Sequence, residues 1–245
     1  MATAGRLLRA DAAAIVLGAG QGLRFGGTVR KQYVRLRGKP VLWWSLAAFE
    51  ASPSIGALIL VAPAADVPKL QAQAMRWKFR KLRAVVPGGK ERSDSVKEGL
   101  KVAPAEARWV AVHDGVRPLI TPAQIETVLA AARKHRAAIA ATPSRDTIKI
   151  ANGQGFVRAS PERRLVWQAQ TPQIFSRALL DRAHRLKGPV TDDAQLVERL
   201  GVRVKLVDTT AENIKVTHPM DLHMADNILK HRGSTRRGGP RAART

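Results

Sequence analysis

The stretch "AAAIVLGAGQGLRFGGTVRKQY", residues 12–33, decides the fold. Six apolar residues lead directly into a loop that holds five glycines, two arginines and one lysine. A continuous apolar run is typical of a strand covered on both faces, as in a parallel sheet. The backbone N–H groups of a glycine-rich loop after such a strand can approach an anion closely. The stretch therefore predicts a buried strand at 13–17 followed by an anion-binding loop.

The rest of the chain repeats this alternation of apolar runs and helix-like segments. Further strands are predicted at 57–62, 82–86, 109–113, 137–142 and 202–207. Helices are predicted at about 40–51, 66–79, 92–102, 122–135 and 219–230, two of which open with Pro40 and Pro219. The alternation predicts an α/β fold with a doubly wound, mostly parallel, Rossmann-like sheet. The loops "GAGQGLRFGG", "PGGKERSDS" and "HDGVRP" would then share the rim at which ligands bind.

One segment, from 142 to 175, interrupts the alternation. "DTIKI", the pair Asn152-Gly153 and "GFVRAS" predict two extended strands joined by a turn. A hairpin of this length cannot bury both of its faces alone, so we expect an arm at approximately 143–168. The arm reaches either over the site or to a second subunit, and we favour a homodimer. We expect a single domain over 1–230 and a basic, disordered tail over 231–245.

The composition narrows the class of protein. A net charge of +23 favours anionic partners, whereas the absence of cysteine excludes disulfides and thiolate metal sites. Aromatic residues make up 4% and fall mostly inside apolar segments, which argues against a specific nucleic-acid-binding protein. The N-terminus lacks the apolar core of a secretory signal, and no apolar run approaches membrane-spanning length. We therefore expect a cytoplasmic protein without membrane contact.

The first loop fits neither of two common nucleotide-binding motifs. A P-loop needs Ser or Thr after Gly-Lys, and a dinucleotide fingerprint needs a third glycine where Leu23 stands. What remains is a glycine loop with Arg24 and Lys31, which can fold so that both cations point at one phosphate. This suits nucleotidyl transfer, in which negative charge develops at the α-phosphate. The alternative, that both are ordinary solvated charges, stays open from the loop alone.

Seven motifs in sequence order resemble those of the 2-C-methyl-D-erythritol 4-phosphate cytidylyltransferase family. They extend from about Ala13 to Ile228 and read "GAGQGLRFG" with "KQY", "PGGKERSDSVKEGL", "VHDGVRP", "RDTIK", "RRLVWQAQTPQIF", "TDDA" and "AENIKVTHPMDL". The resemblance implies transfer of a cytidylyl group from CTP to 2-C-methyl-D-erythritol 4-phosphate, with release of pyrophosphate, in the non-mevalonate isoprenoid pathway. It implies a divalent cation, expected to be Mg²⁺, on the CTP phosphates. A related cytidylyltransferase acting on a pentitol phosphate, such as ribitol 5-phosphate, is the alternative.

The same resemblance assigns roles to individual residues. The implied catalytic cations are Arg24, Lys31, Arg163 and Lys215. The implied nucleotide-binding residues are Leu17, Gly18, Ala19, Gly20, Gly22, Gly88, Gly89 and Ser95. The implied substrate-binding residues are Asp114, Arg117, Thr147, Arg163, Thr171, Thr191 and Lys215. In this family the arm, here with Thr147 and Arg163, enters the neighbouring subunit's site, and the metal has few direct protein ligands, none of which is assigned here. Arg164 is the immediate alternative to Arg163, which is preferred for its spacing from Trp167.

Simpler interpretations remain for several of these positions. Ser95 could lie in a first helical turn capped by Ser93 or Asp94. Asp114 alone could bind a metal, accept a hydrogen bond from a hydroxyl, or pair with Arg117.

Five further positions have structural interpretations or depart from the family pattern. His113 is interpreted as a packing residue, and "DD" at 192–193 as the start of a helix. Arg30 replaces a proline usual in the family and Lys90 an acidic residue, which bears on CTP affinity.

Overall fold

A seven-stranded sheet forms the centre of the molecule. The computed structural model describes residues 10–20 and 29–235. The strand order is β11-β7-β10-β6-β1-β4-β5. The strands are β1 (Ala12–Leu17), β4 (Ile55–Ala62), β5 (Leu82–Pro87), β6 (Trp109–Asp114), β7 (Ala137–Pro143), β10 (Trp167–Ser176) and β11 (Lys205–Asp208). In this sheet, as far as the structure describes the chain, only β10 runs antiparallel to its neighbours, so the predicted mostly parallel α/β sheet is confirmed.

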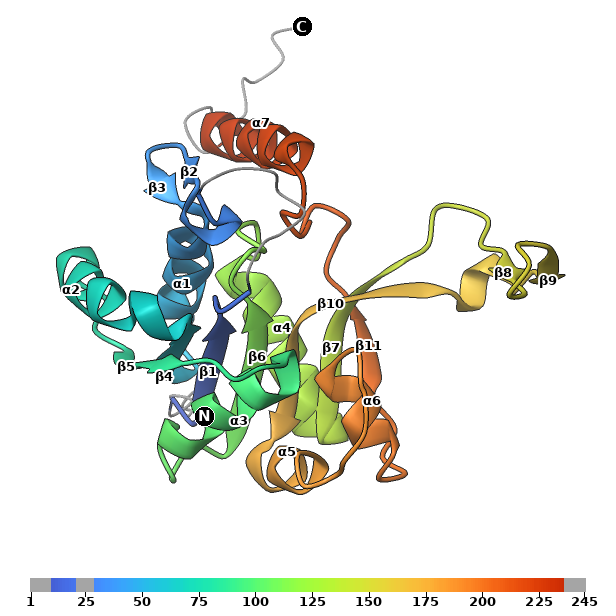
Figure 1. Ribbon diagram of the computed structural model, residues 1–245, viewed down its shortest axis with the longest axis horizontal. Coiled ribbons are helices and arrows are strands. Elements are labelled where there is room, and N and C mark those ends of the chain that lie inside the picture. Colours follow the sequence, from blue (N-terminus) through green and yellow to red (C-terminus); the bar gives the residue numbers. More distant parts are fainter. Residues whose placement is uncertain (1–9, 21–28, 236–245) are drawn as a thin grey trace, which may run out of the picture.

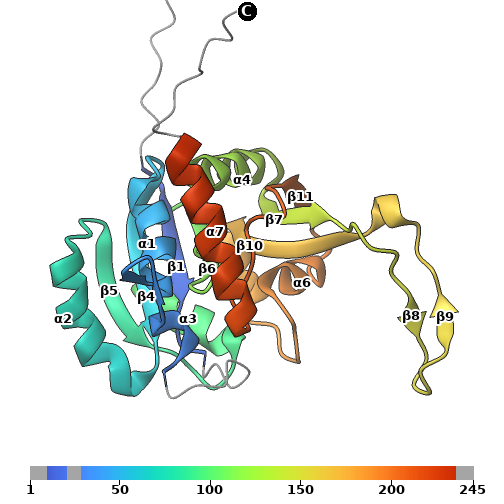
Figure 2. The same ribbon diagram turned by 90° about the horizontal axis from the view of Figure 1, so that it is seen from above.

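Helices cover both faces of this sheet (Figures 1 and 2). They are α1 (Val41–Ala51), α2 (Val67–Trp77), α3 (Arg92–Val102), α4 (Pro122–His135), α5 (Arg177–Ala183), α6 (Asp193–Glu198) and α7 (Pro219–Thr235). Alternate residues of β1 face opposite sides, so that Val16 packs with α1, α2 and α4 while Ile15 packs with α3, α5 and α6. Helix α7 packs on a third, smaller cluster around Leu119. The doubly wound arrangement follows from this two-sided burial.

Most predicted elements match the observed ones within two residues, and the differences concern β10, α5, β11 and α7. Strand β10 and helix α5 were not predicted, and β11 begins at Lys205 rather than at 202. Helix α7 continues to Thr235, so residues 231–235 are helical instead of belonging to the predicted tail. The remainder of that tail, 236–245, lies outside the described residues. No helix in the described part of the chain is long and apolar enough to cross a membrane.

The sequence did not predict strand β10 because this strand contains a proline and four polar residues before its apolar end. Its pairing with β7 shifts between Ala169, opposite Ala141, and Gln173, opposite Ile139. Residues 170–172 therefore leave the regular ladder, and Pro172 falls where no ladder hydrogen bond is needed. The irregularity turns Thr171 toward the end of β6.

The arm leaves the sheet at the end of β7 and returns to it at the start of β10. Pro143 pairs with Trp167, and the Ser144 N–H donates to the Val166 carbonyl at 2.9 Å. Farther out, the two extended strands predicted from "DTIKI" and "GFVRAS" are reduced to the short strands β8 (Ile150–Ala151) and β9 (Val157–Ala159). It projects away from the rest of the molecule (Figure 1).

The turn at the end of the arm contains the predicted Asn152. Its side-chain oxygen accepts hydrogen bonds from the N–H groups of Gln154 and Phe156, both at 3.0 Å. The residue with a positive φ is Gly155, at +86°, and not Gly153. A left-handed backbone favours glycine at that position. The tip is therefore a longer turn than the Asn-Gly pair indicated.

Candidate active site

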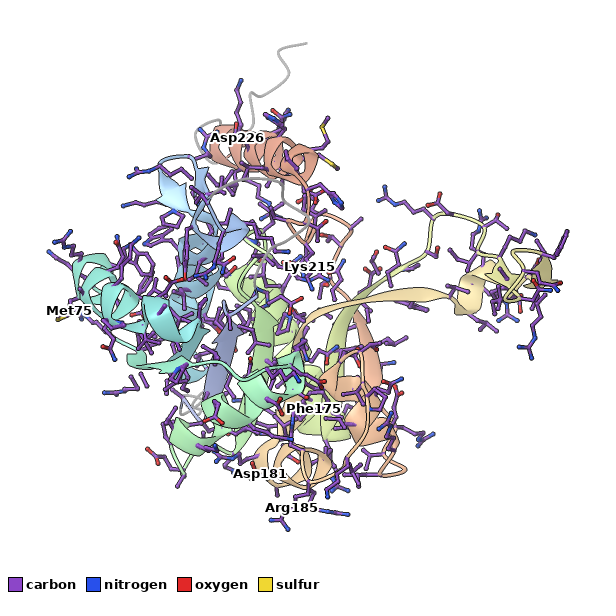
Figure 3. The ribbon with its side chains drawn as sticks, viewed as in Figure 1. Met75, Phe175, Asp181, Arg185, Lys215 and Asp226 are labelled. Atoms are coloured by element: carbon purple, nitrogen blue, oxygen red, sulfur yellow. The ribbon has the colours of Figure 1, made fainter. Side chains whose placement is uncertain are left out.

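The loops after β1, β5 and β6 meet at one end of the sheet around a pocket of about 310 Å³. Lys215, on the loop between β11 and α7, lies at this end (Figure 3). The pocket is lined by Leu17, Gly18, Ala19, Gly20, Lys31, Gln32, Gly89, Lys90, Glu91, Arg92, Ser95, Asp114, Val116 and Lys215. The structure thus brings together three loops and a lysine that are widely separated in sequence.

Gln32 holds the first loop in place. Its side-chain N–H donates to the carbonyls of Gly18 at 2.8 Å and Gly20 at 3.0 Å, and the residue is 1% exposed. Gln32 belongs to a short 3-10 helix, η2 (Lys31–Tyr33), so the same turn carries Lys31 into the pocket lining. The "KQY" motif contains Gln32, but the sequence predicted a role only for Lys31 in that motif. Two predicted site residues of this loop, Gly22 and Arg24, lie outside the described residues.

The loop between β5 and α3 needs glycine to approach the first loop. A Cβ atom on Gly88 would lie 2.5 Å from the Ala19 Cβ and 2.8 Å from the Ser95 hydroxyl oxygen. Gly88 therefore lies behind the pocket, whereas Gly89 and Ser95 line it. The Gly89 N–H donates to the Ser95 hydroxyl at 3.2 Å, and that hydroxyl donates to the Glu91 carbonyl at 3.2 Å. Close packing and these hydrogen bonds fix the loop between β5 and α3 at the edge of the pocket.

The cap of α3 differs from the prediction. Glu91 is the N-cap, and Asp94 completes a capping box by accepting a hydrogen bond from the Glu91 N–H at 3.3 Å. The interpretation of Ser93 or Asp94 as the cap was therefore wrong. Arg92, the first helical residue, lines the pocket and was not predicted. An arginine in the first turn of a helix is unfavourable with respect to the helix dipole. This position in the sequence could have indicated that Arg92 has an acidic partner.

Asp114, at the end of β6, is surrounded by three cations. Its carboxylate lies 2.8 Å from the Lys215 ammonium nitrogen, 3.6 Å from Arg92 Nε and 3.8 Å from Arg117 Nε. Burial alone would raise the pKa of Asp114, but Lys215, Arg92 and Arg117 together hold that pKa well below its usual range. Asp114 is therefore ionised, and the cluster retains an excess of positive charge suited to a phosphorylated ligand.

Arg117 supports the loop that carries Lys215. Its guanidinium donates to the Asn213 carbonyl at 2.8 Å, and the Asn213 side chain donates to the Thr171 carbonyl at 2.9 Å. The Arg117 side chain is 12% exposed and does not line the pocket. In the structure it lies behind Asp114 and connects β6 to the Lys215 loop.

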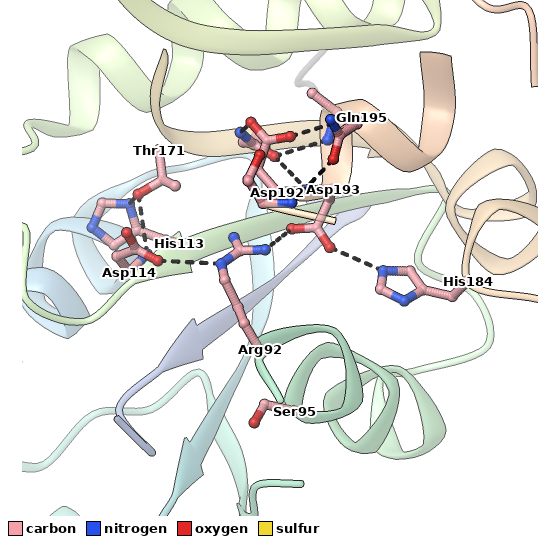
Figure 4. A network of polar contacts seen from close by, with 12 residues as sticks. Arg92, Ser95, His113, Asp114, Thr171, His184, Asp192, Asp193 and Gln195 are labelled. Carbon is pink, nitrogen blue, oxygen red and sulfur yellow. Dashed lines mark hydrogen bonds and ion pairs between the residues drawn. The ribbon is translucent and has the colours of Figure 1, made fainter. Parts of the chain in front are cut away.

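His113 and Thr171 form a second layer behind Asp114. The Asp114 N–H donates to the Thr171 hydroxyl at 3.0 Å, and that hydroxyl lies 3.0 Å from His113 Nδ1 (Figure 4). His113 Nε2 lies 3.3 Å from the Arg117 carbonyl, which can only accept, so Nε2 carries the proton. His113 is thus a hydrogen-bonded positioning group as well as a packing residue. Thr171 is buried and lies outside the pocket lining.

His113 should make the stability of the fold depend on pH. Burial lowers the pKa of His113 to about 4 from 6.5, so the unfolded chain binds a proton at a pH where the folded chain does not. Falling pH therefore favours the unfolded chain, and the stabilisation is complete above about pH 6.5 and lost toward pH 4. We expect His113→Gln to flatten the profile by about 3 kcal/mol over this range. Urea unfolding at successive pH values measures the difference, and parallel profiles for the two proteins would contradict it.

Three predicted substrate-binding residues lie away from the pocket. Thr147 and Arg163 are exposed on the arm, Arg163 in the 3-10 helix η4 (Arg163–Leu165). Thr191 is exposed just before α6, where its N–H donates to the Gln195 side chain at 3.1 Å. Within one chain, the structure does not bring these three side chains to the Asp114 cluster.

The two departures from the family pattern have different surroundings. Arg30 forms an ion pair with Asp66, which also accepts a hydrogen bond from the Tyr33 hydroxyl at 2.7 Å. Lys90 lines the pocket. Of the two substitutions, Lys90 is therefore the one at the pocket wall.

The acidic start of α6 is confirmed, with a further contact that was not predicted. Asp192 is the N-cap, and its side chain accepts a hydrogen bond from the Gln195 N–H at 3.0 Å. Asp193 is buried and forms an ion pair with Arg92 at 2.6 Å. Among the described residues, no group of three or more His, Cys, Asp or Glu side chains could hold a metal ion.

Known proteins resemble this chain over most of its length. The family model described as 2-C-methyl-D-erythritol 4-phosphate cytidylyltransferase matches residues 12–231. Relatives of that name from Desulforamulus reducens and Pelotomaculum thermopropionicum are 42% and 43% identical, over 89% and 90% of this chain and 96% and 94% of theirs.

Solved structures agree with this match. 4-Diphosphocytidyl-2C-methyl-D-erythritol synthase from Anaerococcus prevotii has a TM-score of 0.79 at 32% identity. The 2-C-methyl-D-erythritol 4-phosphate cytidylyltransferase of Thermus thermophilus has a TM-score of 0.73 at 31% identity. Each match covers 89% of this chain and 98% of the other. On sequence and fold, the chain belongs to the 2-C-methyl-D-erythritol 4-phosphate cytidylyltransferase family.

Proposed function

We propose that this protein transfers a cytidylyl group from CTP to 2-C-methyl-D-erythritol 4-phosphate and releases pyrophosphate. The family assignment supports this reaction. The structural observation that carries it is the pocket itself. Lys31, Arg92 and Lys215 come from three separate segments and line one cavity, with Arg117 behind it. Two anionic reactants repel each other, and fixed cations offset that repulsion.

The reaction needs no covalent intermediate. An oxygen of the acceptor phosphate attacks the α-phosphorus of CTP, a P–O bond forms, and the bond to the bridging oxygen of the β-phosphate breaks. The attacking phosphate is already an anion at neutral pH, so no general base is required. Lys31 stabilises the charge that develops at the α-phosphate, and Arg24 is proposed to act with it. Lys215 binds the acceptor phosphate and Asp114 accepts a hydrogen bond from an acceptor hydroxyl.

The nucleoside is proposed to lie between the first two loops. Backbone groups of 17–20, together with Gly89 and Ser95, line that side of the pocket. Rigid backbone donors and acceptors can distinguish the edge of a pyrimidine by hydrogen bonds. Gln32 and the Gly88 contact keep these backbone groups in place.

A divalent cation, expected to be Mg²⁺, would bind to the triphosphate oxygens and neutralise part of their charge. The donor set of the pocket fits this arrangement better than a metal held by the protein. Two carboxylates line the pocket, Asp114 and Glu91. The charge of Asp114 is already balanced by Lys215, Arg92 and Arg117, and Glu91 takes part in the capping box of α3.

The arm is proposed to complete the site of a second subunit in a homodimer. Arg163 and Thr147 lie on it, away from the pocket of their own chain. Ile150, Phe156, Val157 and Leu165 on the same arm are between 48% and 70% exposed. Apolar side chains at this exposure are typical of a surface that packs against a partner. Arg163 would then help to bind the acceptor in the partner's pocket.

Pyrophosphate release tests both the reaction and the acceptor. We expect turnover when the purified protein receives CTP, Mg²⁺ and 2-C-methyl-D-erythritol 4-phosphate, and little or none with ribitol 5-phosphate. The acceptor difference decides between two enzymes that would share the fold and the cations. Turnover with ribitol 5-phosphate alone would overturn the substrate assignment.

A further inference from the structure

Asp193 is a buried carboxylate at the start of α6, behind the pocket residue Arg92. It is 1% exposed, and its two oxygens contact different partners. One lies 2.6 Å from an Arg92 guanidinium nitrogen and the other lies 3.0 Å from His184 Nε2 (Figure 4). Burial alone would raise the pKa of Asp193, but Arg92 and His184 lower it. A buried charge of this kind persists only with well-placed partners.

The backbone around Asp193 is fixed as firmly as its side chain. The Gln173 side-chain oxygen accepts hydrogen bonds from the N–H groups of Asp193 and Ala194, both at 3.1 Å. The Gln173 side-chain N–H donates to Asp192 at 2.8 Å. Gln173 belongs to β10 and is 1% exposed. The start of α6 is therefore tied to the central sheet, and Asp193 gives Arg92 a fixed anchor.

Arg92 uses a second edge of its guanidinium toward the pocket. Its Nε lies 3.6 Å from the Asp114 carboxylate, farther away than its contact with Asp193. Arg92 also directly follows Gly89, Lys90 and Glu91, which line the nucleotide side of the pocket. A planar guanidinium can contact two acceptors in fixed directions, which a lysine ammonium does not reproduce. The same side chain thus adjoins the nucleotide loop and the acceptor-binding carboxylate.

We propose that Arg92 and Asp193 are positioning residues for the acceptor half of the reaction. Asp193 holds Arg92 close, so that Asp114 remains directed toward Lys215 and toward an acceptor hydroxyl. Without Asp193, the guanidinium would move toward Asp114, the nearest remaining carboxylate, and would withdraw it from the acceptor. This role rests on the proposed function, because it assumes that Asp114 contacts the acceptor.

Steady-state kinetics with CTP and 2-C-methyl-D-erythritol 4-phosphate test the pair. We expect Asp193→Asn to raise the KM for the acceptor at least tenfold, with less than a threefold change in the KM for CTP. Arg92→Lys keeps the positive charge but cannot contact both carboxylates through a planar guanidinium. It should likewise raise the KM for the acceptor much more than the KM for CTP. Asp193→Glu should restore most of the acceptor affinity because it restores the carboxylate.

Asp11→Asn is the matched control. Asp11 forms an ion pair with Arg133 at 2.5 Å, and it precedes β1 at the end of the sheet opposite the pocket. It should lower the thermal unfolding midpoint without changing either KM. If Asp193→Asn does not fold, Arg92→Lys and Asp193→Glu decide the question.

The possible outcomes separate the two proposals. Folded Asp193→Asn and Arg92→Lys proteins whose acceptor KM stays within twofold of wild type would overturn the positioning role. The same holds if only their unfolding midpoint falls, since that is a purely structural effect. A wild-type protein that turns over neither acceptor would instead overturn the proposed function.

Discussion

Lys31→Ala is expected to lower kcat/KM by about 10²- to 10³-fold while leaving the fold intact. A single fixed donor aimed at charge that develops in a transition state contributes about 3–4 kcal/mol in comparable sites. Lys31 lines the pocket, and Gln32 next to it anchors the glycine loop, so the side chain can be removed without releasing the loop. Pyrophosphate release measures the rate, and the thermal unfolding midpoint reports the fold.

Lys101→Ala controls for the loss of one lysine charge. Lys101 is on α3, 66% exposed, and pairs only with Glu98 among the contacts described for it, at 2.7 Å. Its removal should leave the rate unchanged. Turnover of Lys31→Ala at the wild-type level would remove Lys31 from the catalytic residues.

Mixing Lys31→Ala with Arg163→Ala should restore activity that neither variant has alone. If each pocket uses its own Lys31 and the partner's Arg163, every site in either variant dimer lacks one group. A hybrid dimer has one site with both. Random exchange makes about half of the dimers hybrid, so about a quarter of the sites are complete. The measurement is pyrophosphate release after subunit exchange, compared with each variant alone.

Arg164→Ala is the matched control for the arm. Arg164 adjoins Arg163 in η4 and forms an ion pair with Glu162 on the same surface. It should keep most of its activity, since the proposed acceptor contact belongs to Arg163. No recovery in the mixture, under conditions in which exchange is demonstrated, would mean that each arm serves its own subunit.

Local sequence patterns predicted those parts of the fold that depend on local physics. The apolar run at β1 is buried on both faces, and its continuous hydrophobicity shows this directly. Strand β10 was missed because its polar first half and Pro172 contradict the usual strand pattern. That departure is the irregular segment that turns Thr171 toward Asp114. The usual strand pattern fails in β10 because the backbone there is shaped to place a residue of the site.

The site shows the same division between local and distant contacts. Lys31 and the glycine loop follow one strand, so their shared position can be read from a short motif. Arg92 and Asp193 are separated by 101 residues, and the sequence around either residue does not predict that the other is its partner. Their ion pair depends on how β10 places the start of α6. The contact between Arg92 and Asp193 therefore could not be predicted from a single sequence.

The ion pairs of Asp114 bear on how the pocket exists before any reactant arrives. Lys215, Arg92 and Arg117 would repel one another if no anion lay among them. Asp114 serves as a built-in counter-ion, so the positive groups are already assembled in the ligand-free protein. A phosphate group that binds therefore meets cationic side chains that are already in place. The side chains need little rearrangement on binding.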